Sequence, residues 1–174
     1  MKKVYLGLIG VCLAVFVWYG FTMSSTTGDY NEGTYFGFDE EHNYTAAVYV
    51  GEDGMIKSVL IDAAYTSDCK IVDEEAECTG ITKRTLGDDY NMKTYGGAEY
   101  EWYEQADLFG DMVVEEQGLD FVDWRYKDSD DKIVTEMPIG QELDDEVYTD
   151  AVSGVTVHVA EMYKAVEEAL KLAE

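Results

Sequence analysis

The sequence predicts an α+β domain, in which an antiparallel β-sheet packs with helices behind an apolar N-terminal segment. Three β-prone runs follow one another within residues 33–61, and two helical patterns come later without regular β-α alternation. Of the 174 residues, roughly 150 follow the apolar segment, enough for one domain with a real core. We expect an anchor or uncleaved signal over residues 1–23, a linker over 24–32 and the domain over 33–174.

The first element is a membrane span. Lys2 and Lys3 precede Val4–Thr22, a run of nineteen residues without a charge. At about 1.5 Å per helical residue this run matches a bilayer core, and the lysines should stay cytoplasmic. A cleaved signal peptide is the competing interpretation, although its apolar region is usually only about 7–15 residues long. We therefore predict a single-pass cell-membrane protein with its domain on the extracytoplasmic side.

The next elements are three strands. Residues 24–32 are polar and contain glycine, as a linker does. Residues 33–38, 44–50 and 55–61 are rich in aromatic and β-branched side chains. Asp53-Gly54 between the last two runs is a strong hairpin signal. The three runs should form an antiparallel unit.

The middle of the chain is less regular and then becomes helical. Residues 64–97 hold the acidic run 73–77 and several glycines, and a long loop of this kind inside a compact domain is often functional. Residues 99–117 place apolar side chains on one helical face, with Gly118 as the terminator. The members of this face are Trp102, Ala106, Phe109, Val113 and Gln117.

Two further strands and a final helix complete the predicted elements. Residues 121–126 and 132–136 should pair around the turn at 128–131. A helix is expected from about Val157 to Ala173. Its apolar stripe consists of Val159, Met162, Tyr163, Val166, Ala169 and Leu170.

Charge and cysteines limit the possible partners. A net charge of −25 repels nucleic acid, so DNA and RNA are excluded as partners. Cys69 and Cys78 lie nine residues apart on the predicted outer side, where either a disulfide or two free thiols is possible. A metal site would need more ligands, and the chain holds only two histidines, His42 and His158. We predict no metal site.

The segment that carries chemistry is residues 150–156, directly before the last helix. Asp150, Ser153 and Gly154 form a turn that leads into a helix N-terminus, where free N–H groups and the helix dipole favour an anion. A hydroxyl at Thr156 would meet a phosphate whose charge is already compensated. Simple helix capping explains the same residue types.

The pattern Asp150-x-x-Ser153-Gly154-x-Thr156 resembles the flavinylation motif of FMN-binding domains. Such domains occur in the sodium-pumping quinone reductase, in Rnf-type complexes and in extracellular electron-transfer lipoproteins of Gram-positive bacteria. The resemblance implies that Thr156 carries FMN through a phosphoester bond. It also implies a dedicated flavin transferase that uses FAD and a divalent metal.

The resemblance extends over roughly residues 30–172. Residues 33–37 and 53–59 resemble the opening strand and second hairpin of the family, and residues 82–92 and 101–106 resemble its extracellular electron-transfer branch. Two positions depart from the family pattern. Val155 stands where alanine is usual, and His158 where serine or threonine is usual. Valine could slow the transferase, and the histidine is either solvated or a contact of the flavin phosphate.

The remaining site residues are expected to support the cofactor. Asp150 caps the turn or is read by the transferase, and Ser153, with the amides of Gly154 and Val155, borders the phosphate. Tyr90, Met92 and Trp102 could form the apolar wall that an isoalloxazine ring needs, or belong to the core.

The expected function is that of an electron carrier without catalytic residues of its own, because the cofactor does the chemistry. It would pass electrons from a membrane dehydrogenase or the quinone pool to an external acceptor. The alternative is a non-redox cell-surface binding module with the same fold.

Overall fold

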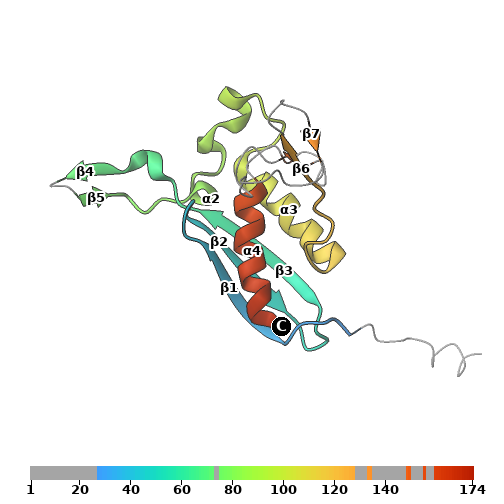
Figure 1. Cartoon of the computed structure of the whole chain (residues 1–174). Helices are drawn as coiled ribbons and strands as arrows, with labels where there is room; N and C mark the ends of the chain where they lie inside the picture. Colours follow the sequence, from blue (N-terminus) through green and yellow to red (C-terminus); the bar gives the residue numbers. More distant parts are fainter. Residues whose placement is uncertain (1–26, 73–74, 128–132, 135–147, 150–154, 156–158) are drawn as a thin grey trace, which may run out of the picture.

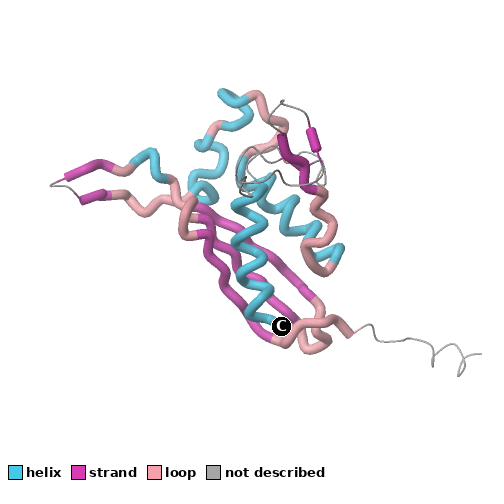
Figure 2. The backbone as a smooth tube through the Cα atoms, viewed as in Figure 1, coloured by secondary structure: helices cyan, strands magenta, loops and turns pink. Residues whose placement is uncertain are grey.

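The computed structural model describes residues 27–72, 75–127, 133–134, 148–149, 155 and 159–174. Within them the protein is α+β, as predicted. A three-stranded antiparallel sheet is covered on one face by two helices, and shorter elements lie beyond its end (Figures 1 and 2). No helix among the described residues is long and apolar enough to cross a membrane, and the predicted span Val4–Thr22 lies outside those residues.

The central sheet is the meander β1-β2-β3, formed by β1 (Gly33–Asp39), β2 (Tyr44–Val50) and β3 (Ile56–Ala63). The strands follow the predicted runs to within two residues at every end. Pairing aligns Phe36 with Ala47, and Ala47 with Leu60. The turn between β2 and β3 contains Gly54 at a φ of 72°, the left-handed conformation that an Asp-Gly turn requires.

The inner face of the sheet carries the core. Helix α4 (Val159–Ala173) lies along β1 and β2, and α3 (Trp102–Glu116) lies along β3 (Figure 1). The fully buried side chains between these layers include Val48, Val50, Ile56, Ile61, Phe109, Val113, Met162 and Val166. The predicted helical stripes therefore do face the sheet. Helix α4 is described from Val159 onward, and the predicted start at Val157 lies outside the described residues.

One glycine sets the distance between α4 and the sheet. A Cβ at Gly37 would lie 1.9 Å from the carbonyl oxygen of Ala165 and 2.5 Å from the amide nitrogen of Ala169. Both atoms belong to the helix backbone, so no side-chain rotation relieves the contact. Gly37 is thus the place where α4 rests directly on β1.

The outer face of the same sheet is not covered by any described element. Phe36 and Phe38 are each 58% exposed, and Tyr49 and Leu60 are also exposed. The alternation along each strand places these four side chains opposite to the helices. They form an apolar patch across β1, β2 and β3, hereafter the outer sheet patch.

Residues 64–97, which the sequence predicted as a loop, hold regular structure. A hairpin of β4 (Lys70–Val72) and β5 (Glu75–Glu77) extends away from the sheet and helices (Figure 1). It is followed by α2 (Lys83–Leu86), η2 (Gly87–Tyr90) and η3 (Met92–Gly96). The prediction missed these elements because each is at most five residues long, too short for a periodic pattern.

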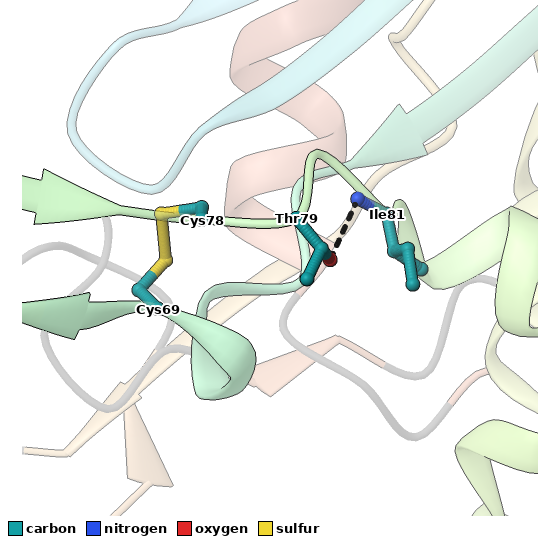
Figure 3. Close-up of a disulfide and its surroundings, with 4 residues drawn as sticks. All are labelled: Cys69, Cys78, Thr79 and Ile81. Atoms are coloured by element: carbon teal, nitrogen blue, oxygen red, sulfur yellow. Dashed lines mark hydrogen bonds between the residues drawn. A yellow bond between two sulfur atoms is a disulfide. The ribbon is translucent and has the colours of Figure 1, made fainter.

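A disulfide closes the base of this hairpin. The Sγ atoms of Cys69 and Cys78 lie 2.03 Å apart, and just beyond Cys78 the amide of Ile81 donates to Thr79 Oγ1 over 3.4 Å (Figure 3). The two cysteines flank the strands, so the link joins both ends of the β4–β5 arm.

The small sheet β7-β6-β8 contains the second predicted strand pair. Strand β6 (Trp124–Lys127) pairs antiparallel with β7 (Ile133–Val134) and with β8 (Tyr148–Thr149). Tyr126 opposite Val134 agrees with the predicted pairing of residues 121–126 with residues 132–136.

Candidate functional site

The predicted site residues divide into two groups. Asp150, Ser153, Gly154, Thr156 and His158 lie outside the described residues. Val155 is described and is buried in the same core cluster as Trp102 and Val159. Val155 and Val159 flank the motif threonine in sequence. Of the segment 150–158, the structure thus places only Val155, in the core.

Trp102 belongs to the core and cannot form the exposed apolar surface that was predicted to bind an isoalloxazine ring. Its side chain is 1% exposed and meets the Tyr44 ring edge-on, with ring centroids 5.9 Å apart. Tyr90 and Met92 are half-buried and pack on the outside of the same core cluster. Of the three residues predicted to contact an isoalloxazine ring, only Tyr90 and Met92 are partly exposed and could contact a planar ligand.

A lysine that sequence reasoning missed lies among these aromatic rings. Lys83 Nζ donates a hydrogen bond of 3.0 Å to the hydroxyl of Tyr44. The same nitrogen lies 4.7 Å from the centroid of the Tyr44 ring, 5.4 Å from that of Trp102 and 5.8 Å from that of Tyr90. An ammonium at such distances from several ring faces is stabilised by cation–π attraction. We call Lys83, Tyr44, Tyr90 and Trp102 the lysine box.

Electrostatics inside the box reflect its burial. Burial lowers the pKa of the Lys83 ammonium, and the carboxylate of Glu161 opposes this decrease. Glu161 belongs to the first turn of α4 and is 6% exposed. The first turn of the helix that follows the motif is therefore within electrostatic reach of Lys83.

Tyr44 stays protonated at any ordinary pH. Burial raises the pKa of its hydroxyl well above the usual value, and the negative charge of Glu161 adds to the rise. The indole Nε1 of Trp102 approaches that hydroxyl and opposes the rise, but the pair falls short of hydrogen-bond geometry. The box thus offers one cation, two phenols and one buried indole N–H.

Neighbouring contacts hold Lys83 in place. Thr82 caps α2 by accepting the amide hydrogen of Thr85 over 3.1 Å. Arg84 anchors the same turn, because its Nε donates to Ile61 O over 2.9 Å and its Nη2 pairs with Asp107 over 2.9 Å. Helix α2 is therefore attached to both β3 and α3. A helix of only four residues needs such anchors to keep its geometry.

The segment with Tyr90 and Met92 is anchored in a similar way. Glu101 accepts the amide hydrogens of Met92 over 2.8 Å and of Lys93 over 3.1 Å. Its own amide donates to Glu104 Oε2 over 2.8 Å, which completes a capping box at the start of α3. Glu101, a buried residue, thus connects the segment with Tyr90 and Met92 to the start of α3.

A cavity of about 440 Å³ opens at the end of the sheet where the chain turns from β1 into β2. Tyr44 lines it, together with the carboxylates of Asp39, Glu40 and Asp62. Two of these carboxylates already bind protein donors: Asp39 contacts His42 Nδ1 at 3.0 Å, and Asp62 accepts the amide hydrogen of Ala63 over 2.8 Å. Among the described residues no group of His, Cys, Asp and Glu is arranged to hold a metal ion.

The residues that the structure adds to the site are Lys83, Tyr44 and Glu161. They come from α2, β2 and α4, more than a hundred positions apart at the extremes, so no local pattern could have connected them. The only available signal was that residues 82–92, which include Lys83 and Tyr90, belong to a segment of the family resemblance. The chain matches no protein-family model, no curated protein and no solved structure.

Proposed function

We propose that this protein is an extracytoplasmic electron carrier whose FMN is bound covalently to Thr156. The observation that carries the proposal is the motif Asp150-x-x-Ser153-Gly154-x-Thr156, placed directly before a terminal helix. The apolar run Val4–Thr22 with its preceding lysines supports an uncleaved anchor and an outward-facing domain. The donor would be a membrane dehydrogenase or the quinone pool, and the acceptor lies outside the cell.

Two features of the described residues are compatible with a flavin. An isoalloxazine ring needs an apolar surface, which the half-buried Tyr90 and Met92 offer. A group that gains negative charge on reduction is stabilised by a nearby cation, and Lys83 Nζ lies 5.8 Å from the centroid of the Tyr90 ring. FMN, once bound, supplies the electron transfer, while the protein supplies position, burial and charge.

The proposed function requires no acid–base pair. The titratable groups of the lysine box are a lysine and tyrosines that are held by burial and hydrogen bonds. No substrate needs to be protonated there, so we propose a carrier and not an enzyme. Reduction of an artificial acceptor would still be measurable.

Mass spectrometry of the full chain, produced with and without a flavin transferase, tests the proposal. Wild-type protein should gain the mass of one FMN only with the transferase, and the flavin should survive denaturation. Thr156→Ala should gain none, while Thr149→Ala, a nearby threonine on β8, should be flavinylated like the wild type. Flavin on the Thr156→Ala protein refutes the attachment point. Colourless wild-type protein would instead favour the non-redox surface module, for which the acidic cavity beside Tyr44 is the natural binding site.

A further inference from the structure

The outer sheet patch continues into the acidic cavity at the end of the sheet. Pairing aligns Phe38 with Thr45, and Thr45 with Asp62. Directly paired residues point to the same face of a sheet, so Asp62 lies on the outer face in one row with Phe38. The neighbouring row holds Phe36 and Leu60. Phe38 and Asp62 also line the cavity, so the apolar surface and the carboxylates are continuous there.

Two carboxylates of the cavity remain available to a ligand. Asp62 accepts the amide hydrogens of Ala63 over 2.8 Å and of Arg84 over 3.2 Å, both with Oδ1. Within the described part of the chain, its Oδ2 accepts no hydrogen bond. Glu40 is exposed at the turn after β1, and its side chain forms no hydrogen bond or ion pair with another described residue. An incoming N–H group can therefore bind either carboxylate without displacing a protein donor.

No basic side chain among the described residues lines the cavity, whereas three carboxylates do. Nearby basic side chains are already engaged by the protein: His42 with Asp39, Lys83 with the Tyr44 hydroxyl, and Arg84 with Asp107. Negative charge is therefore in excess at this end of the sheet, and the whole chain has a net charge of −25. A cation is attracted to such a site.

Charge decides which occupant fits the outer sheet patch. A second copy of the chain would bring a further charge of −25 to the contact, and a lipid surface with anionic head groups would be repelled as well. A partner with apolar and basic side chains meets both features. Its apolar side chains bury the exposed rings of Phe36 and Phe38, and its ammonium or guanidinium binds Asp62 through charge-assisted hydrogen bonds.

We propose that the outer sheet patch and the adjoining cavity form one docking surface for a basic amphipathic segment of a partner protein. The apolar face of that segment covers Phe36, Phe38 and Leu60, and one lysine or arginine side chain enters the cavity beside Asp62. Attraction between opposite charges accelerates association and makes the affinity depend on salt. The docking needs no flavin, so it stands apart from the proposed function and is tested with protein that carries none.

A synthetic amphipathic helix tests the proposal. A helix of about four turns is about 22 Å long, which matches the seven residues of β1. The probe has leucines on one face and arginines along both borders of that face. One matched peptide has glutamate in place of each arginine, and another has serine in place of each leucine. Each labelled peptide is titrated with the full-length chain in zwitterionic nanodiscs, with empty nanodiscs as the blank, and fluorescence anisotropy gives the affinity.

The wild-type chain should bind the leucine–arginine peptide at least about tenfold more tightly than either matched peptide, and salt should weaken the binding. Asp62→Asn removes a cavity charge and should weaken binding about tenfold, and Glu40→Gln should weaken it less. Phe36→Thr removes apolar surface and should also weaken binding. The controls are Glu115→Gln and Leu172→Ala, which change an exposed carboxylate of α3 and an exposed apolar side chain of α4 on the opposite face of the sheet. Both should bind as the wild type does.

Several results overturn the proposal. Equal affinities for the arginine and glutamate peptides show that charge does not select the partner. Wild-type affinity in Asp62→Asn, Glu40→Gln and Phe36→Thr, or an equal loss in the two controls, shows that the peptide binds elsewhere. Peptide that binds only after residues 1–26 are removed assigns the face to the chain's own N-terminal segment, and wild-type protein that forms dimers and excludes the peptide assigns it to a second copy. If Asp62→Asn fails to fold, the two substitutions at exposed positions, Glu40→Gln and Phe36→Thr, decide.

Discussion

Replacing Cys69 and Cys78 by serine removes the crosslink at the base of the β4–β5 arm. The two residues are nine apart in sequence, so the closed loop holds about ten residues and is worth about 2.7 kcal/mol by the chain-entropy relation. Strands β4 and β5 pair with each other and make few contacts with the other described elements. The loss should therefore appear as local opening of the arm and not as global unfolding.

Amide hydrogen exchange measures this opening directly. A loss of about 2.7 kcal/mol corresponds to roughly a 100-fold faster exchange of the protected amides of Lys70–Val72. Exchange in α4 should not change. Reductant should reproduce the effect in the wild type and leave the double-serine variant unaffected. The reasoning is refuted if the melting temperature falls by more than about 5 °C, since about 2–4 °C per kcal/mol is typical when a crosslink stabilises a whole domain of this size.

Three further changes follow from contacts described above. Gly37→Ala forces its Cβ into the backbone of α4 and should cost about 1–3 kcal/mol in a urea unfolding titration, whereas an unchanged midpoint would mean that the helix can move without cost. Gln117→Glu replaces the amide that donates to Ile56 O over 3.0 Å, and it should cost about 1–3 kcal/mol at pH 7 in the same assay, less where the carboxyl is protonated. Asp88→Asn with Asp89→Asn removes two exposed charges of η2 and should raise the midpoint potential of the proposed flavin, because reduction adds negative charge; added salt should raise the wild-type midpoint, and indifference to both refutes the electrostatic argument.

The elements predicted best are those whose pattern repeats over several turns or strands. The hairpin of β2 and β3 follows from Asp53-Gly54 between two β-prone runs, and α4 follows from its apolar stripe. Gln117 shows where such patterns stop. It continues the spacing of α3, but the structure has it at a φ of 59° as the C-cap, with its side chain bonded to Ile56 on β3. Spacing cannot distinguish the last helical residue from the first residue after it.

For the candidate site, the sequence could suggest only what a local motif carries, and that suggestion stays a prediction because Thr156 lies outside the described residues. The motif is local, so seven residues sufficed to suggest Thr156 as an attachment point. Trp102 was predicted either as wall or as core and belongs to the core, because α3 begins with that side chain beneath Tyr44. Lys83 carries no local signal at all. Its role depends on rings from three elements that only the folded chain brings together.

The outer sheet patch has a consequence for how copies of this protein behave in bulk solution. Two exposed phenylalanines on one sheet face would ordinarily invite association. A net charge of −25 makes every copy repel the others, so colloidal repulsion compensates for the exposed aromatic surface. That protection is conditional. Acidification toward the isoelectric point near pH 4.1, or high salt, removes the repulsion and leaves the patch. Turbidity should therefore increase under both conditions, and substitution of Phe36 and Phe38 by threonine should suppress it without changing the charge.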